Sequence, residues 1–276
     1  MVNLLFCGND SAFDGILTCM LSVVKRSAST EPYGVTVFTM DVRHLGENYL
    51  PVSDEHMELL RTVLQRHNPE STVRKVDVTA LYTDAFAGCP NEGAYCSPYT
   101  LIRLFADQVD LPDKVLYLDA DILFNRDIHL LYDIPLDGYE YAAAPDHYGK
   151  YLIHPRYINA GVLLFNMTEA RKTGLFAQAR TWIQTKKLVF ADQSALIRST
   201  TKRKLLPQRF NDRKFLHKHT VVRHFSKRLF WLPYPHTDNV KQWQVDRVHS
   251  VFHYTQFDDI LNEYLTLKET ADRSFT

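Results

Sequence analysis

The order of apolar segments near the start of the chain is the feature that most restricts its fold. Short apolar runs at Val2–Cys7, Gly34–Met40 and Val73–Val78 have the length of buried strands. Between them, residues 13–25 and 51–66 carry apolar side chains at helical spacing. Alternating strands and helices form a parallel sheet with crossover helices, so we predict an α/β fold with a mixed, mainly parallel central sheet flanked by helices.

The rest of the chain continues this plan. Further strands are expected at residues 114–118, 139–145 and 160–165, and further helices at 99–108, 168–187, 193–199 and 258–268. Asn166 is expected to end a strand and to help start the helix after it. The chain has no internal repeat and no linker rich in glycine or serine, which predicts a single domain over residues 1–276.

Charge and cysteine usage exclude several classes of protein. The 276 residues include 32 basic and 32 acidic side chains, so no overall field recruits nucleic acid or an anionic membrane, although the chain from Lys202 onward is more basic and aromatic. No apolar run approaches the roughly 20 residues that cross a bilayer, and the N-terminus lacks the features of a signal peptide. We therefore expect a cytoplasmic protein with at most peripheral contact at the inner face of the membrane. Reduced thiols are expected at Cys7, Cys19, Cys89 and Cys96.

The strongest candidate for a chemical site is the carboxylate pair Asp119 and Asp121, which directly follows the predicted strand at residues 114–118. Ligands of parallel sheets bind beyond the carboxyl ends of the strands. Hard cations such as Mg²⁺ and Mn²⁺ take oxygen ligands and bridge carboxylates to substrate phosphates. Two solvated turn aspartates are the alternative, but apolar segments on both sides place the pair in the core region, where charged groups need a partner.

Four segments together resemble the family 8 glycosyltransferases, which include glycogenin and bacterial lipopolysaccharide hexosyltransferases. These segments are Phe6–Asp10, Leu116–Asp121, Asn159–Asn166 and Asp192–Gln193, in the order and spacing of that family. The resemblance covers residues 1–225 well and the remainder loosely. It implies a GT-A fold, the Rossmann-like fold of nucleotide-diphospho-sugar transferases.

The resemblance also implies an activity. Its members transfer a hexose with retention of configuration, so we expect glucose or galactose to move from a UDP-hexose donor to a saccharide or lipid-linked acceptor, with Mn²⁺ or Mg²⁺ bound. Residues 1–125 would form the nucleotide-binding half, residues 126–225 the half that binds the sugar and acceptor, and residues 226–276 a variable part.

Donor contacts are implied position by position at Asn9, Asp10, Arg103, Asp119, Ala120, Asp146 and Lys241. Asn9 and Asp10 would meet uracil and ribose, and Asn9 stands where many members have an aspartate. Two of these positions also have a purely structural interpretation. Arg103 could cap a surface helix, and Asp146 could start a turn.

The implied metal ligands are Asp119, Asp121 and His224, with His253 as the rival histidine. Lys241, in a Lys-Gln-Trp segment, is expected to reach the diphosphate. Lys227 and Arg228 are rivals for that role.

The implied catalytic positions are Asn159, Asp192 and Gln193, which would line the sugar, with Gln193 on the face opposite the leaving group. Asn159 could instead mark a bend at the start of a strand, and Asp192 could be a helix N-cap. Ser194 stands where the family often has a second aspartate. Its presence favours return of the acceptor hydroxyl from the front face, or another nucleophile.

Other functions remain open at this point. They are a non-catalytic sugar-nucleotide binder, a glycogenin-like enzyme that glucosylates itself, and a nucleotidyltransferase. Gly8-Asn9-Asp10 is not the glycine-rich phosphate loop that nucleotidyltransferases usually need.

Overall fold

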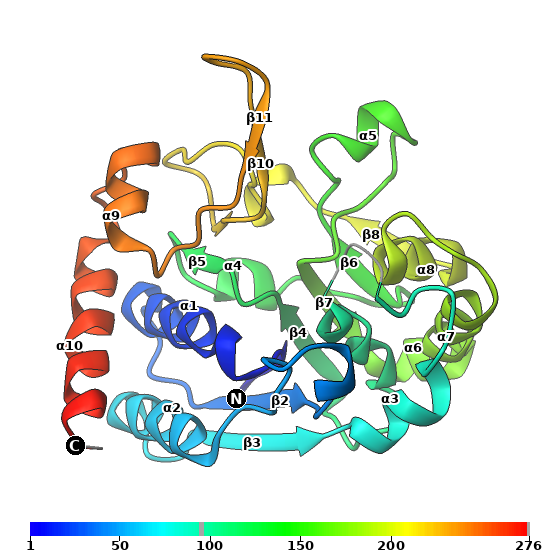
Figure 1. The fold of residues 1–276 in the computed structure, drawn as a ribbon, viewed down its shortest axis with the longest axis horizontal. Helices are drawn as coiled ribbons and strands as arrows, with labels where there is room; N and C mark the ends of the chain where they lie inside the picture. Colours follow the sequence, from blue (N-terminus) through cyan, green and yellow to red (C-terminus); the bar gives the residue numbers. More distant parts are fainter. Residues whose placement is uncertain (94–96, 275–276) are drawn as a thin grey trace.

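The computed structural model describes residues 1–93 and 97–274, and its centre is a seven-stranded sheet (Figure 1). The strand order is β3-β2-β1-β4-β7-β6-β8. The strands of this sheet are β1 (Val2–Cys7), β2 (Tyr33–Thr39), β3 (Thr72–Asp77), β4 (Lys114–Leu118), β6 (Tyr141–Ala143), β7 (Val162–Asn166) and β8 (Arg203–Leu205). Strand β7 is antiparallel to both β4 and β6, and the other neighbours are parallel, which confirms the mixed, mainly parallel sheet.

Helices cover both faces of the sheet (Figure 1). They are α1 (Phe13–Arg26), α2 (Asp54–His67), α3 (Thr79–Phe86), α4 (His129–Tyr132), α5 (Gly149–Leu152), α6 (Met167–Thr173), α7 (Leu175–Thr185), α8 (Ala191–Ser199), α9 (Val245–Arg247) and α10 (Asp258–Ser274). None of the described helices is long and apolar enough to cross a membrane.

Two hydrophobic cores lie on opposite faces of the sheet because side chains alternate along each strand. In β1, Leu4 and Phe6 belong to the core beneath α1 and α2, whereas Leu5 and Cys7 belong to the core beneath α3 and α7. Strand β1 has apolar side chains at both its odd and its even positions, and it is therefore buried on both faces, as predicted from the sequence. Cys7, Cys19 and Cys89 are free thiols, and Cys96 lies outside the described residues.

Two predicted helices have a different form. In place of the helix expected at residues 99–108 there are two short 3₁₀ turns, Pro98–Thr100 and Ile102–Phe105, and residues 101–106 are all buried. The long helix expected at 168–187 is divided by Gly174, whose φ of 70° is left-handed and ends α6. Helix α3 was not predicted. Asn166 does cap α6, since its side chain accepts a hydrogen bond from Glu169 N at 3.2 Å.

A small second sheet completes the edge where β4 ends. Strand β5 (Ile122–Phe124) pairs antiparallel with β9 (Val222–His224), and Ile122 lies opposite His224. The turn between β4 and β5 contains Asp119, Ala120 and Asp121. The Asp119 amide donates to Gly161 O at 2.8 Å, and Asp121 O accepts from Phe225 N at 2.7 Å. Backbone hydrogen bonds thus hold three distant segments together.

A third pair of strands, β10 (Arg228–Phe230) and β11 (His236–Asp238), forms a projecting hairpin (Figure 1).

Gly15 lets α1 approach this turn closely, and its replacement provides a test. A Cβ at Gly15 would lie 2.4 Å from Ala120 O and 2.7 Å from a Trp243 ring carbon. Glycine to alanine inside a helix normally stabilises by about 0.5–1 kcal/mol. We expect Gly15→Ala to destabilise instead, by about 1–3 kcal/mol, because the backbone carbonyl must move. Urea unfolding measures the effect, and a stabilised variant would show that this contact is loose.

Candidate active site and metal centre

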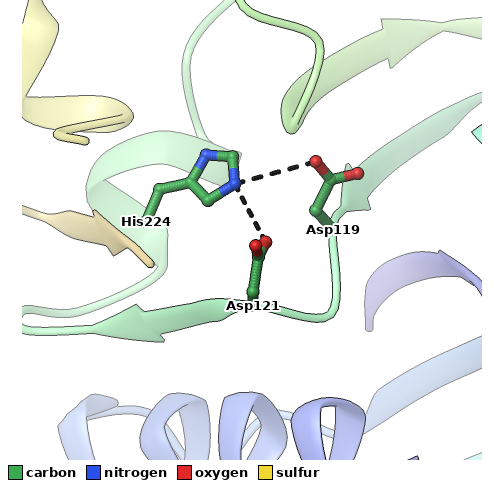
Figure 2. Close-up of side chains that lie close together, drawn as sticks. All are labelled: Asp119, Asp121 and His224. Atoms are coloured by element: carbon green, nitrogen blue, oxygen red, sulfur yellow. Dashed lines mark ion pairs between the residues drawn. The ribbon is translucent and has the colours of Figure 1, made fainter. Parts of the chain in front are cut away.

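Asp119, Asp121 and His224 point toward one small volume at the end of β4 (Figure 2). His224 Nε2 lies 2.9 Å from Asp121 Oδ1 and 3.7 Å from Asp119 Oδ2. One atom from each of the three side chains lies within 4.8 Å of the others, and among the described residues this is the cluster that could hold a metal ion. His253, the rival histidine, is not part of it.

A chain of hydrogen bonds determines which nitrogen of His224 carries the proton. Asn159 Oδ1 accepts from Gly161 N at 3.1 Å and from Asn211 Nδ2 at 2.8 Å. This leaves Asn211 Oδ1, an acceptor, 2.9 Å from His224 Nδ1. Nδ1 must therefore donate, which leaves Nε2 as the ring nitrogen that faces the two carboxylates, the position from which a neutral imidazole offers its lone pair to a metal ion.

This arrangement fits a divalent cation. His224 is buried, and its Nε2 makes no hydrogen bond of acceptable geometry despite its closeness to Asp121. A lone pair and two carboxylates facing one another repel unless a positive charge lies between them. Histidine nitrogen and carboxylate oxygen are ligands that Mn²⁺ and related ions accept, and ligating histidines usually donate their other N–H to a nearby acceptor.

Each carboxylate keeps one oxygen for this volume and uses the other elsewhere. Asp119 Oδ1 accepts from Tyr117 Oη at 2.6 Å and from Arg103 Nη2 at 3.2 Å, which leaves Oδ2 facing His224. Asp121 Oδ2 is paired with Lys241 Nζ. Burial by itself would raise the pKa of Asp121, but the positive charge of Lys241 and the His224 ring offset it and hold that pKa well below its usual range. Asp121 is therefore ionised.

Arg103 is not a surface residue. Its side chain is 2% exposed, and its guanidinium lies 4.0 Å from the centre of the Tyr117 ring. The same group contacts Asp119, Asp192 at 3.3 Å and the carbonyl of Ala160. Burial would lower the pKa of Arg103, but the acidic groups around it more than offset this and raise it. The positive charge of Arg103 thus lies between two of the predicted site residues, Asp119 and Asp192.

Gly161 explains why a small residue follows Asn159-Ala160. A Cβ at this position would lie 2.3 Å from His224 Cε1 and 2.7 Å from Asp119 Oδ2. The absence of a side chain thus leaves room for two of the potential metal ligands. Gln193 is held at the same place, since its Oε1 accepts from Ala160 N at 3.0 Å.

Asp146 starts a turn and also belongs to the hydrogen-bond network that includes Asn159 and Arg213. Its Oδ1 accepts from Tyr148 N at 3.0 Å, and its Oδ2 accepts from Asn159 Nδ2 at 3.2 Å. Arg213 forms an ion pair with this carboxylate. Asp192 lies inside α8 rather than at its N-cap, which is Phe190.

Asn9 shares a groove of about 260 Å³ with Asp119, Ala120, Asp121 and Lys241. The other residues that line it are Cys7, Gly8, Ala12, Ser97, Tyr99, Thr100, Tyr117 and Trp243.

Asp10 does not line this groove. Its Oδ1 accepts from Ser53 N at 2.9 Å and lies 2.7 Å from His56 Nδ1. The structure thus brings most of the predicted residues together and leaves Asp10 to one side.

Lys241-Gln242-Trp243 packs on the turn that carries the carboxylates. Gln242 is fully buried and donates from Nε2 to Ala120 O at 2.7 Å and to Thr18 Oγ1 at 3.0 Å. This anchors Lys241 beside Asp121. Arg228, one of the two rivals of Lys241 for the diphosphate, lies on β10 at the start of the projecting hairpin.

Three residues of the network were not predicted: Tyr117, Asn211 and Arg213. Tyr117 is the next-to-last residue of β4 and has the appearance of a core aromatic in the sequence. Asn211 and Arg213 lie in an irregular basic segment with no recognisable pattern, so only the folded chain shows their role.

Comparison with known proteins identifies the family of this chain. A sequence profile described as glycosyl transferase family 8 matches residues 3–213. The chain belongs to glycosyl transferase family 8. Among curated proteins of Streptococcus pneumoniae serotype 4 (strain ATCC BAA-334 / TIGR4), the glycosyltransferase GlyF is 29% identical over 118 residues, which is 43% of this chain and 28% of GlyF. The glycosyltransferase GlyB is 37% identical over 68 residues, which is 25% of this chain and 16% of GlyB. The matches therefore span less than a third of either relative.

Solved structures show the same fold. The galactosyltransferase LgtC, solved with donor and acceptor sugar analogues, superposes with a TM-score of 0.67 at 19% identity, over 95% of this chain and 96% of LgtC. The bifunctional glycosyltransferase WbbM gives a TM-score of 0.69 at 19% identity, over 95% of this chain and 49% of WbbM. The chain has the GT-A fold, as the resemblance implied.

The hydrogen bond from His224 Nδ1 to Asn211 can be tested through metal affinity. Asn211→Ala removes the acceptor that holds the Nε2 lone pair toward the carboxylates. We expect the affinity for Mn²⁺ to fall by about 10–100-fold, as for other residues that orient metal ligands.

Calorimetric titration of Mn²⁺ measures this affinity. Asn91→Ala is the matched control, because Asn91 is also buried and its Nδ2 donates to Ile183 O at 2.6 Å and to Lys186 O at 2.7 Å, which belong to the end of α7 and the residue after it. A thermal melt of each variant checks that it is folded. Unchanged Mn²⁺ affinity in Asn211→Ala would contradict the proposed orientation of His224.

Proposed function

We propose that this protein is a metal-dependent, retaining hexosyltransferase that moves glucose or galactose from a UDP-sugar to a saccharide or lipid-linked acceptor. The observation that carries the proposal is the orientation of His224, whose Nε2 faces Asp119 and Asp121 beside the groove that Asn9 also lines. Membership of family 8 supports the transfer of a sugar. LgtC, which has the same fold, is a galactosyltransferase, and this supports a hexose as the group that is transferred.

Asp119, Asp121 and His224 would hold a divalent cation, with Mn²⁺ or Mg²⁺ as the candidates. When bound, such an ion neutralises the charge that develops on a diphosphate leaving group. Lys241 lies at the edge of the same groove, with Nζ against Asp121. Its ammonium would add a second positive charge next to the diphosphate, so we assign it that role ahead of Lys227 and Arg228.

Asn9 would hydrogen-bond the uracil edge through its amide, and Asp10, beyond the groove lining, is the weaker candidate for the ribose. Ala120 would contribute backbone contacts to the donor, since its position between the two carboxylates lines the groove. Arg103 would act on the donor through Asp119, because its guanidinium is buried behind that carboxylate. It is a positioning residue in this proposal.

The sugar would lie against Asn159, Asp192 and Gln193. Asp192 is buried and paired with Arg103, and Asn159 uses its amide in hydrogen bonds to its neighbours. We therefore assign these two residues to orienting groups around the sugar, together with Asp146. Gln193 is the residue that would face the anomeric carbon, with its amide held by Ala160 N.

Retention would follow from attack on the face that the leaving group occupies. Ser194 offers no carboxylate, and its hydroxyl is 3.0 Å from Tyr157 Oη. Asp192 is charge-paired and poorly suited to attack carbon. Both features favour return of the acceptor hydroxyl from the front face, with Gln193 and its neighbours stabilising the positive character of the sugar.

Release of UDP tests the activity directly. The protein is incubated with a panel of UDP-sugars, with Mn²⁺ or with EDTA, and UDP is quantified. We expect release from one UDP-hexose that EDTA abolishes, and a loss of about 10²-fold or more in Asp121→Ala, because a preorganised charge on the leaving-group side is removed.

Asp137→Ala is the control, since Asp137 is exposed and belongs neither to the groove lining nor to the cluster of potential metal ligands. Tight, metal-dependent UDP binding without release from any donor, with simple sugar acceptors added, would favour a non-catalytic sugar-nucleotide binder. Absence of UDP binding would refute the proposal altogether.

A further inference from the structure

Two segments with exposed apolar tips project from the body on the same side of the molecule (Figure 1). The first is the β10–β11 hairpin, whose tip exposes Trp231, Leu232 and Tyr234 by 68%, 83% and 66%. The second is the loop that contains α5, where Tyr151, Leu152 and Ile153 are exposed by 78%, 80% and 53%. We call these two segments the prongs. Large apolar side chains gathered in this way usually mark a contact surface.

Both prongs start at the active site. Helix α5 begins at Gly149, three residues after Asp146, and β10 begins at Arg228, four residues after His224. Arg213 connects the two starting points, because it pairs with Asp146 and donates from Nε to Ser226 Oγ at 2.6 Å. The six steps along the chain from Ser226 to Leu232 span up to about 20 Å, at about 3.3 Å per residue of extended chain.

The chain around the prongs is strongly basic. Residues 202–236 contain a single acidic residue, Asp212, against ten basic ones: Lys202, Arg203, Lys204, Arg209, Arg213, Lys214, Lys218, Arg223, Lys227 and Arg228. Residues 147–156 contain Lys150 and Arg156 and no acidic residue. The whole chain has a formal charge of zero, so positive charge is concentrated in this part of it.

Part of this charge lines a hollow next to the second prong. Arg156, Lys202, Arg203 and Lys204 surround a pocket of about 670 Å³ together with His154. Arg156 and His154 follow α5 directly, so the pocket lies at the base of that prong. Basic side chains beside an exposed apolar segment match the headgroup and acyl layers of an anionic bilayer.

We propose that the two prongs dock this protein on an anionic lipid surface and so present the active site to an acceptor held at that surface. This inference rests on the proposed function and narrows its acceptor to a lipid-linked one. Tryptophan and tyrosine beside leucine are the residues that settle at a membrane interface, and each nearby lysine or arginine adds attraction to anionic headgroups.

A membrane explains the arrangement better than a protein partner does. Two narrow tips that stand apart from the body touch a plane together, whereas a protein interface needs a continuous, closely packed face. The proposed attachment is peripheral, because the exposed tips would enter the interface without crossing the bilayer.

The test is co-flotation of the full chain with phosphatidylcholine vesicles that contain or lack phosphatidylglycerol. We expect binding to the anionic vesicles that falls as salt is raised. The triple variant Trp231→Ser, Leu232→Ser, Tyr234→Ser should lower the bound fraction by about tenfold or more, because its apolar tip no longer enters the interface. A second variant with Tyr151→Ser, Leu152→Ser and Ile153→Ser should act in the same direction.

Val189→Ser is the matched control, since Val189 is 81% exposed and belongs to neither prong. It should bind vesicles as the unaltered protein does. UDP release without lipid should be equal in all these proteins, so loss of vesicle binding is distinguishable from failure of the proposed function. Absence of binding to anionic vesicles, or unchanged binding in both triple variants, would overturn the proposal. Self-association that depends on the tips, measured by light scattering, would replace it with a protein contact.

Discussion

The hydrogen bond between Asn211 and His224 Nδ1 is the interaction on which the site depends. It holds the ring so that Nε2 is directed at Asp119 and Asp121. One atom from each of three potential metal ligands thus faces one small volume. Two cations lie beside it, Arg103 behind Asp119 and Lys241 against Asp121. A divalent ion in this volume would be held by all three side chains, so the geometry favours metal binding.

Buried charge also constrains how the site can change. Arg103 lies between Asp119 and Asp192 with almost no exposure to solvent. Removing one member of such a set leaves an uncompensated charge in a medium of low dielectric, which costs more than the pair contributes in stability. The three side chains are therefore coupled energetically, although they come from separate segments of the chain. Arg103 thus links the Asp119 turn to helix α8.

The chain segments that carry His224 and Asp146 continue directly from the site into the two prongs. The chain passes from His224 into the β10–β11 hairpin, and from Asp146 into the loop with α5. Arg213 ties these two exits together. In the proposed function, a surface that engages the prongs would thus lie next to the metal centre, because the same two connections lead to both.

The sequence by itself determined six of the seven strands of the main sheet, its longest helices and the place of the carboxylate pair, because each depends on local periodicity and on apolar runs, whereas β8 was not predicted. Leu4 and Phe6 alternate with Leu5 in β1, and the Asp119–Asp121 turn follows β4 directly. Local patterns failed where burial overrides them, as in residues 101–106, and where Gly174 divides a helix.

Only the tertiary structure decided how the site is completed. His224 reaches Asp121 because β9 pairs with β5, a contact between segments about a hundred residues apart that no spacing in the sequence encodes. Asn211 and Arg213 belong to an irregular segment, and their roles follow from hydrogen bonds that exist only once β9 is in place. Residue identity thus set which chemical groups were available, whereas long-range strand pairing set which of them meet.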